Sequence, residues 1–258
     1  METIYQFIKS GQYTVSAGYG ATIPGRTSGS FSPGSGTVVS VGFQNNGNAV
    51  SCWASQLFVT DSGTVYFEIC NAAPSSTDFW IWCVVDTTSA PSDYSIMQSQ
   101  QYTTPGGGIG FSDPTIKSTS GEIASVGVQN IDNATNFSIP KVLVSTPKEA
   151  YVQTCNWALS ATNWCVWSVV NSQKNYNIVT SQTYTCEKGS SLPERGTQSV
   201  QFVPGGGTVV SVGVQVFSES SDTFVTQMFV IDGANVYVQV STTSNSFDWC
   251  IWCVVDPS

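Results

Sequence analysis

The sequence predicts an all-β fold made of three tandem antiparallel units of about 85 residues each. Three observations lead to this prediction. Apolar residues alternate with polar ones, as in half-buried strands, and no segment shows the stripe of an amphipathic helix. Blocks of sequence recur in one order along the chain. Charged residues make up only 10% of the chain, against roughly 25% in an ordinary soluble domain.

The repeat is clearest in a glycine-led block that reads as a strand. It occurs as GTVVSVGFQ at 36–44, as GEIASVGVQ at 121–129 and as GTVVSVGVQ at 207–215. Two further sets keep the same register, namely Tyr66, Tyr151 and Tyr237, and Trp82, Trp167 and Trp252. Because independent blocks keep one order, we expect repeats at 1–90, 91–173 and 174–258.

Each repeat is expected to contain about five strands. In the first repeat these are an opening strand at Tyr13, the 36–44 block, a strand near Leu57, a strand at Tyr66 and a closing strand at Trp82. Glycine and proline mark the turns between them. This content favours small units of the β-sandwich or Greek-key type.

The closing strand also predicts how the repeats pack. In the third repeat Trp249 and Ile251 lie on one face of this strand, and Trp252 and Val254 lie on the other. A strand that is apolar on both faces must be covered on both. We therefore expect the three units to pack together with pseudo-threefold symmetry, rather than to follow one another as separate beads.

Charge and composition exclude several classes of function. The net charge is −9, so the long-range field opposes binding to nucleic acid. The chain has no histidine, which removes the usual general base and the commonest metal ligand. We therefore expect no enzymatic activity, no cofactor and no metal site.

The eight cysteines are expected to be free, buried thiols. No cysteine position is occupied in all three repeats, so a disulfide is not needed for the fold of a unit. Cys250 and Cys253 have the spacing of a metal or redox pair, but residues three apart on a strand point to opposite faces.

No apolar run approaches the roughly 18 residues of a membrane helix, so no transmembrane segment is expected. The first residues lack the features of a signal peptide. Cytosolic, leaderless-secreted and surface-associated locations all stay open.

An acidic or amide residue precedes an aromatic one at the start of each closing strand. A carboxylate or amide that binds hydroxyl groups, beside a ring that covers the apolar face of a sugar, makes an elementary carbohydrate site. The alternative is structural, because such polar residues favour turns and aromatic residues fill cores. The tyrosines of the opening strands are further candidates. The candidate ligand-binding residues are Asp78, Phe79, Asn163, Trp164, Asp248, Trp249, Tyr13, Tyr102 and Tyr184.

These observations favour a non-catalytic, multivalent carbohydrate-binding protein, a lectin with up to three related sites and glycans as partners. One alternative is a structural or adhesive subunit that self-associates through strand edges, with the strand at 4–8 donated to a neighbour. A further alternative is a β-rich, membrane-active toxin, for which the Ser- and Thr-rich stretch at 218–226 is suitable. No motif is specific enough to name a family.

Overall fold

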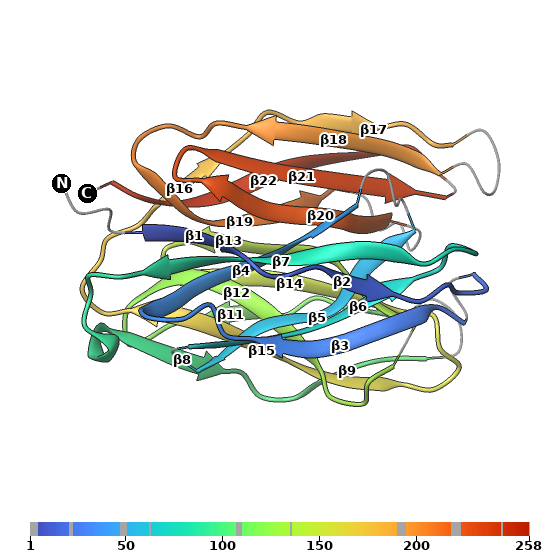
Figure 1. Ribbon diagram of the computed structural model, residues 1–258, viewed down its shortest axis with the longest axis horizontal. Helices are drawn as coiled ribbons and strands as arrows, with labels where there is room; N and C mark the ends of the chain where they lie inside the picture. Colours follow the sequence, from blue (N-terminus) through green and yellow to red (C-terminus); the bar gives the residue numbers. More distant parts are fainter. Residues whose placement is uncertain are drawn as a thin grey trace.

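The computed structural model describes residues 5–20, 23–46, 51–61, 63–106, 110–134, 136–189, 195–217, 223–243 and 245–257. Within these ranges the regular structure consists of β-strands, and the only helical element is the 3-10 turn η1 (Pro91–Asp93). The strands run mainly along the long dimension of the molecule (Figure 1). The prediction of an all-β fold is confirmed.

The described strands fall into three groups that follow the repeats. Repeat 1 contains β1 (Tyr5–Lys9), β2 (Tyr13–Val15), β3 (Gly25–Phe31), β4 (Thr37–Asn45), β5 (Cys52–Asp61), β6 (Thr64–Asn71) and β7 (Thr77–Asp86). Repeat 2 contains β8 (Tyr94–Gln98), β9 (Tyr102–Thr104), β10 (Gly110–Ser112), β11 (Thr115–Lys117), β12 (Glu122–Asn130), β13 (Phe137–Thr146), β14 (Glu149–Asn156) and β15 (Thr162–Asn171). Repeat 3 contains β16 (Asn177–Thr180), β17 (Tyr184–Cys186), β18 (Gly196–Phe202), β19 (Thr208–Val216), β20 (Thr223–Asp232), β21 (Asn235–Thr242) and β22 (Phe247–Asp256).

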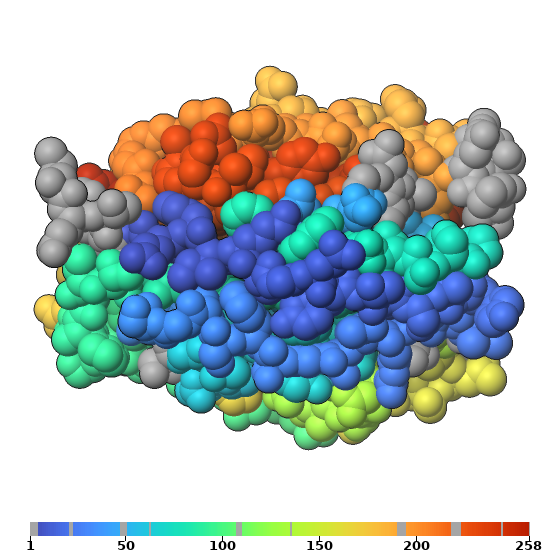
Figure 2. Space-filling view, in the orientation of Figure 1, coloured from blue at the N-terminus to red at the C-terminus, as the bar shows by residue number. Residues whose placement is uncertain are grey.

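Each repeat divides its strands between two antiparallel sheets, and each sheet combines strands of two repeats. Sheet A has the order β1-β7-β4-β20-β21-β18, with β2 beside β7. Sheet B has the order β3-β6-β5-β12-β15-β8, with β9 beside β15. Sheet C has the order β10-β14-β13-β19-β22-β16, with β11 beside β14 and β17 beside β22. The repeats are therefore joined in a ring, first to second, second to third and third to first. In Figure 2, repeat 1 lies against repeat 3 on one side and repeat 2 on the other.

The repeats contain more strands than the five expected. Two kinds of strand were not among the five: the first strand of each repeat (β1, β8 and β16), of which only the one at 4–8 was considered, and the polar edge strand, such as β3. The β3 sequence GRTSGSF carries few apolar residues, and no residue of this strand is fully buried. Among the described strands β3 pairs only with β6, at the edge of its sheet. The strand proposed for donation to a neighbour is instead β1, which pairs with β7 of the same chain. That part of the self-association hypothesis is wrong.

A repeated glycine makes each joint between repeats possible. At the joint of sheet A, Phe43 pairs with Met228, and a Cβ atom on the adjacent Gly42 would lie 2.3 Å from the Met228 carbonyl oxygen. Gly127 and Gly213 have the same close approach in sheets B and C. On sheet A the gap above Gly42 lets Trp82 stack on Phe229, with ring centroids 5.1 Å apart. Gly42, Gly127 and Gly213 are thus required by inter-repeat packing.

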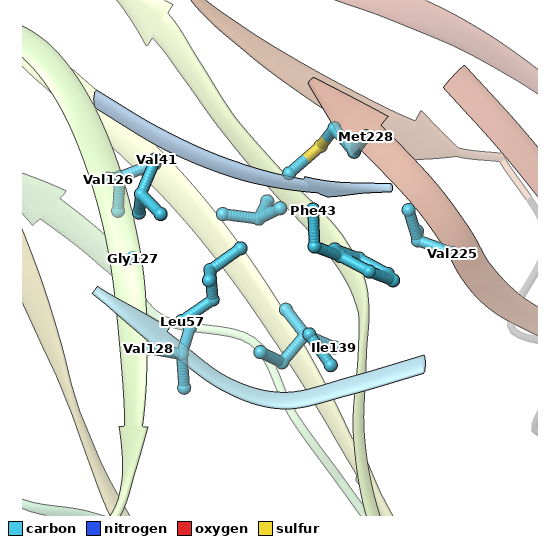
Figure 3. Close-up of a pocket in the computed structure, with 11 residues that line it drawn as sticks. Val41, Phe43, Leu57, Val126, Gly127, Val128, Ile139, Val225 and Met228 are labelled. Carbon is cyan, nitrogen blue, oxygen red and sulfur yellow. The ribbon is translucent and has the colours of Figure 1, made fainter. Parts of the chain in front are cut away.

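The main core lies where the three sheets face one another. Side chains from all three repeats, including Phe43, Leu57, Ile139 and Met228, surround a small apolar cavity (Figure 3). Its volume is about 30 Å³, room for water-sized molecules only, and it is lined mainly by hydrocarbon. This cavity is a packing gap at the centre of the ring of repeats, and it is too small for an organic ligand.

Tyrosine hydroxyls also link neighbouring repeats. Tyr5 donates to Asp256 at 2.6 Å, and Tyr94 donates to Asp86 at 2.8 Å. In the third corresponding pair the acceptor position is held by Asn171, and the buried hydroxyl of Tyr176 lies beside the hydroxyls of Tyr5 and Tyr94. The cyclic order of these pairs follows the pseudo-threefold arrangement of the sheets.

All eight cysteines are buried thiols outside any disulfide, as expected for side chains that pack as small apolar groups. Burial raises the pKa of Cys83 and of Cys253 to about 12. No helix in the described part of the chain is long and apolar enough to cross a membrane. Of the stretch considered for membrane insertion, 218–222 lies outside the described residues, and 223–226 is the buried start of β20.

Candidate functional site

Strand pairing brings the predicted site residues of each repeat together. In each repeat the short strand that carries the tyrosine (β2, β9 or β17) pairs with the start of the closing strand (β7, β15 or β22). This pairing places the tyrosine opposite the aromatic residue and the following threonine opposite the acidic or amide residue. The pairs are Tyr13 with Phe79 and Thr14 with Asp78, Tyr102 with Trp164 and Thr103 with Asn163, and Tyr184 with Trp249 and Thr185 with Asp248.

The aromatic half of each predicted pair is buried. Phe79, Trp164 and Trp249 each have 0% of their surface exposed. Successive side chains on a strand point to opposite faces, so a polar residue that faces solvent directs its neighbour into the core. The expectation that the polar residue and the ring are exposed together is therefore wrong.

The tyrosines are half-buried and cover the buried rings. The ring centroids of Tyr13 and Phe79 are 5.4 Å apart, and both Tyr102 with Trp164 and Tyr184 with Trp249 are 5.2 Å apart. In the first repeat Tyr13 also packs on Phe67, at 4.9 Å. These contacts make the tyrosines part of the core edge, with only a fraction of each ring at the surface.

The acidic or amide residue of each pair lies at the surface, and a threonine hydroxyl donates a hydrogen bond to its side chain. Thr14 donates to Asp78 at 2.7 Å, Thr103 donates to Asn163 at 2.9 Å, and Thr185 donates to Asp248 at 2.7 Å. In the third repeat the bond reaches only Oδ1 of Asp248, and no described residue bonds Oδ2. The Asp248 carboxylate is therefore oriented by the protein and retains an oxygen for a ligand.

A different residue brings an exposed ring to Asp248. Phe217 follows β19 directly, and its backbone N–H donates to the carbonyl of Asp248 at 2.9 Å. The side chain of Phe217 is 52% exposed, a large fraction for an aromatic residue. Repeat 3 thus has both a candidate carboxylate and an exposed ring, but the ring is Phe217 and not the predicted Trp249.

Phe217 and Asp248 line an open cleft of about 290 Å³ together with Thr185, Ser246 and the buried Phe247. This volume lies near the lower end of small-molecule sites, which begin at about 300 Å³. The Ser246 hydroxyl donates to Glu187 at 2.8 Å and accepts from the backbone N–H of Lys188 at 3.0 Å. The cleft therefore combines one apolar face with two hydroxyl groups and a carboxylate.

The other two repeats have the same backbone arrangement without the ring. Asn46 and Ile131 occupy the position of Phe217, and their N–H groups bond the carbonyls of Asp78 and Asn163. Ile131 is 38% exposed, and the neighbouring Asp132 accepts a hydrogen bond from the Asn163 N–H at 2.7 Å. Repeat 3 is the one that joins a carboxylate to an exposed aromatic face.

Other aromatic residues singled out by the repeat have structural positions. Trp82, Trp167 and Trp252 lie half-buried on the outer faces of the sheets, and each donates its indole N–H to a glutamine, Gln44, Gln129 and Gln215 respectively. Trp53 is 1% exposed and donates to the carbonyl of Phe137. None of these rings lines the cleft of repeat 3.

Comparison with known proteins adds no family. No protein-family model matches the chain, and no curated protein is similar to it in sequence. Within the described ranges no group of three histidine, cysteine, aspartate or glutamate side chains is placed to hold a metal ion. The cleft in repeat 3 is the candidate site because of its own geometry.

Proposed function

We propose that the protein is a non-catalytic carbohydrate-binding protein whose principal site is the cleft of repeat 3. One observation carries this proposal: the oriented carboxylate of Asp248 lies beside the exposed ring of Phe217 in an open cleft. A sugar ring has an apolar face that packs on an aromatic ring and hydroxyl groups that donate to a carboxylate. The hydroxyls of Thr185 and Ser246 complete a polar rim.

The corresponding positions of repeats 1 and 2 fit weaker, related sites. Asp78 supplies a carboxylate without a ring, and Asn163 supplies an amide beside an aliphatic side chain, Ile131. Several weak sites on one body increase the affinity for a branched or repeated glycan, because later contacts form within an existing complex. The proposal therefore keeps multivalent binding but gives the three positions unequal strength.

A glycan array tests this function with matched variants. Phe217→Ala removes the exposed ring of the cleft, and Ile131→Ala changes the same position of repeat 2. We expect Phe217→Ala to abolish most binding, Ile131→Ala to weaken it only slightly, and both variants to keep the thermal melt of the parent. A folded parent that binds no glycan, or equal binding by Phe217→Ala and the parent, would overturn the proposal.

Self-association is a second candidate, and the sheet edges support it. The seven-residue strands β3 and β18 each end a sheet and pair with a single described neighbour, β6 and β21 respectively. Unpaired strand edges with few charges can pair with another chain. Light scattering over a range of protein concentrations tests this alternative, which requires the mean mass to increase with concentration.

A further inference from the structure

The charges around the cleft of repeat 3 suggest a more specific ligand, and this step rests on the function proposed above. Asp248 lines the cleft, and Glu187 lies at its rim through the 2.8 Å hydrogen bond from Ser246. Lys188 follows Glu187 in the chain and is exposed, and no ion pair joins it to another described residue. The site thus has two carboxylates, Asp248 and Glu187, and one ammonium group, that of Lys188.

The wider protein adds to this negative field. The net charge is −9, so an anionic sugar meets repulsion on approach and again at Asp248. A positively charged ligand is attracted at long range and gains a charge-assisted hydrogen bond to the open oxygen of Asp248. The exposed ring of Phe217 can also attract a cation through its face.

We propose that the cleft of repeat 3 selects sugars that carry a protonated amine, with the ammonium group on Asp248 and the sugar ring on Phe217. The cleft volume of about 290 Å³ is suitable for one sugar unit. The hydroxyls of Thr185 and Ser246 lie in the same cleft and donate their protons to Asp248 and Glu187, so their oxygens can only accept hydrogen bonds from the hydroxyls of the ligand. A sugar that carries a carboxylate should bind most weakly, because Asp248 repels it.

The test compares four ligands that share one ring: glucosamine, glucose, N-acetylglucosamine and glucuronate. Isothermal titration of the full chain at about pH 6 keeps the glucosamine amine protonated. We expect glucosamine to bind about fivefold more tightly than glucose or N-acetylglucosamine, because an exposed charge pair contributes a gain in affinity of about this size. Glucuronate should bind most weakly.

Two variants of the cleft identify the source of the preference. Asp248→Asn reproduces the amide that repeat 2 carries at Asn163, where the bond from threonine is retained, so the fold is expected to persist. We expect this change to lower the affinity for glucosamine more than the affinity for glucose, so that the preference of about fivefold is lost. Lys188→Ala removes the opposing ammonium group and increases the preference.

The outcomes separate this inference from the function on which it rests. Equal affinity for glucosamine and glucose, with both lost in Phe217→Ala, overturns the amino-sugar inference and supports a neutral-sugar site. A preference for glucosamine that persists in Asp248→Asn also overturns it. Absence of binding by all four ligands and by a glycan array overturns the carbohydrate-binding function itself.

Discussion

The hydroxyl of Thr185 donates a 2.7 Å hydrogen bond to Oδ1 of Asp248, and this bond sets the direction of the carboxylate in the candidate cleft. The pair joins the opening strand of repeat 3 to its closing strand. Because the residues are exposed, the bond contributes little to stability and mainly positions the group that meets the ligand.

Replacing Thr185 by valine should therefore reduce binding more than stability. We expect sugar affinity to fall about three- to tenfold, because a free Asp248 side chain must be ordered by the ligand. The free energy of unfolding should change by less than about 0.5 kcal/mol, as for other surface substitutions. Titration calorimetry and urea denaturation measure the two effects. Thr14→Val is the matched control in repeat 1, and an equal loss of affinity in that control would contradict the assignment of the site.

The joint glycines should be among the least replaceable residues. In Gly42→Ala the new methyl group meets the Met228 carbonyl oxygen at 2.3 Å, and backbone on both sides must move. We expect a loss of about 3 kcal/mol in the free energy of unfolding. Gly11→Ala is the control, because no atom lies within 4 Å of a Cβ there. Similar stabilities for the two variants in urea would show that the joint is not packed as described.

The tyrosine hydroxyls between repeats should differ in their contributions. Tyr94→Phe removes a hydrogen bond to the buried carboxylate of Asp86 and should cost about 1.5–3 kcal/mol. The hydroxyl of Tyr176 meets those of Tyr5 and Tyr94 and makes no hydrogen bond to a carboxylate, so Tyr176→Phe should cost less than Tyr94→Phe. Urea denaturation of the two variants checks this ranking, and the reverse order would contradict it.

Asp86 should make stability depend on pH in the acid range. Burial by itself raises the pKa of this carboxyl, but hydrogen bonds from Ser89, Thr88 and Tyr94 outweigh burial and hold the pKa below its ordinary value of 3.8. Because the folded-state pKa is the lower one, the ionised form stabilises the fold above the unfolded-state value. That contribution is lost as the pH falls through the folded-state pKa.

The Asp86→Asn variant isolates this contribution. The difference in free energy of unfolding between parent and variant should be constant near neutral pH and should shrink below about pH 4. Urea denaturation at a series of pH values measures it. A difference that stays constant down to about pH 2 would contradict the role given to Asp86.

The thiols should be unreactive in the folded protein. All eight cysteines are buried thiols outside any disulfide, and burial raises the pKa of Cys70 to about 12, which leaves very little thiolate at neutral pH. We expect the native chain to react slowly with a thiol reagent and the denatured chain to release eight equivalents. Fewer equivalents after denaturation, restored by a reductant, would show that disulfides are present.

The repeated sequence blocks predicted the class of fold and the three similar units, because strand periodicity and repeat spacing depend on local sequence. The sharing of each sheet between two repeats could not be predicted in this way. It depends on contacts such as Phe43 with Met228, which lie far apart in the chain and have no local signature. The edge strand β3 was missed because its residues are mostly polar and small.

The site was predicted in part, for a similar reason. Asp248 and Tyr184 were identified from the repeat, and the pairing of β17 with β22 brings the two segments that contain them together. The choice of Trp249 as the exposed ring failed, because alternation along β22 directs that side chain into the core. Phe217 follows the repeated block at a position where the other repeats have Asn46 and Ile131. This aromatic residue, at a position where the other two repeats have none, was the sequence signal from which the cleft could have been predicted.

The most direct test of the central claim is an NMR titration of isotope-labelled protein with a pyranose that the glycan array identifies. We predict saturable shifts of the backbone amides of Thr185, Phe217 and Asp248, with smaller shifts at Thr14 and Asp78 of repeat 1. Shifts confined to other parts of the surface, or no saturable shift at all, would contradict the assignment of the cleft of repeat 3 as the carbohydrate site.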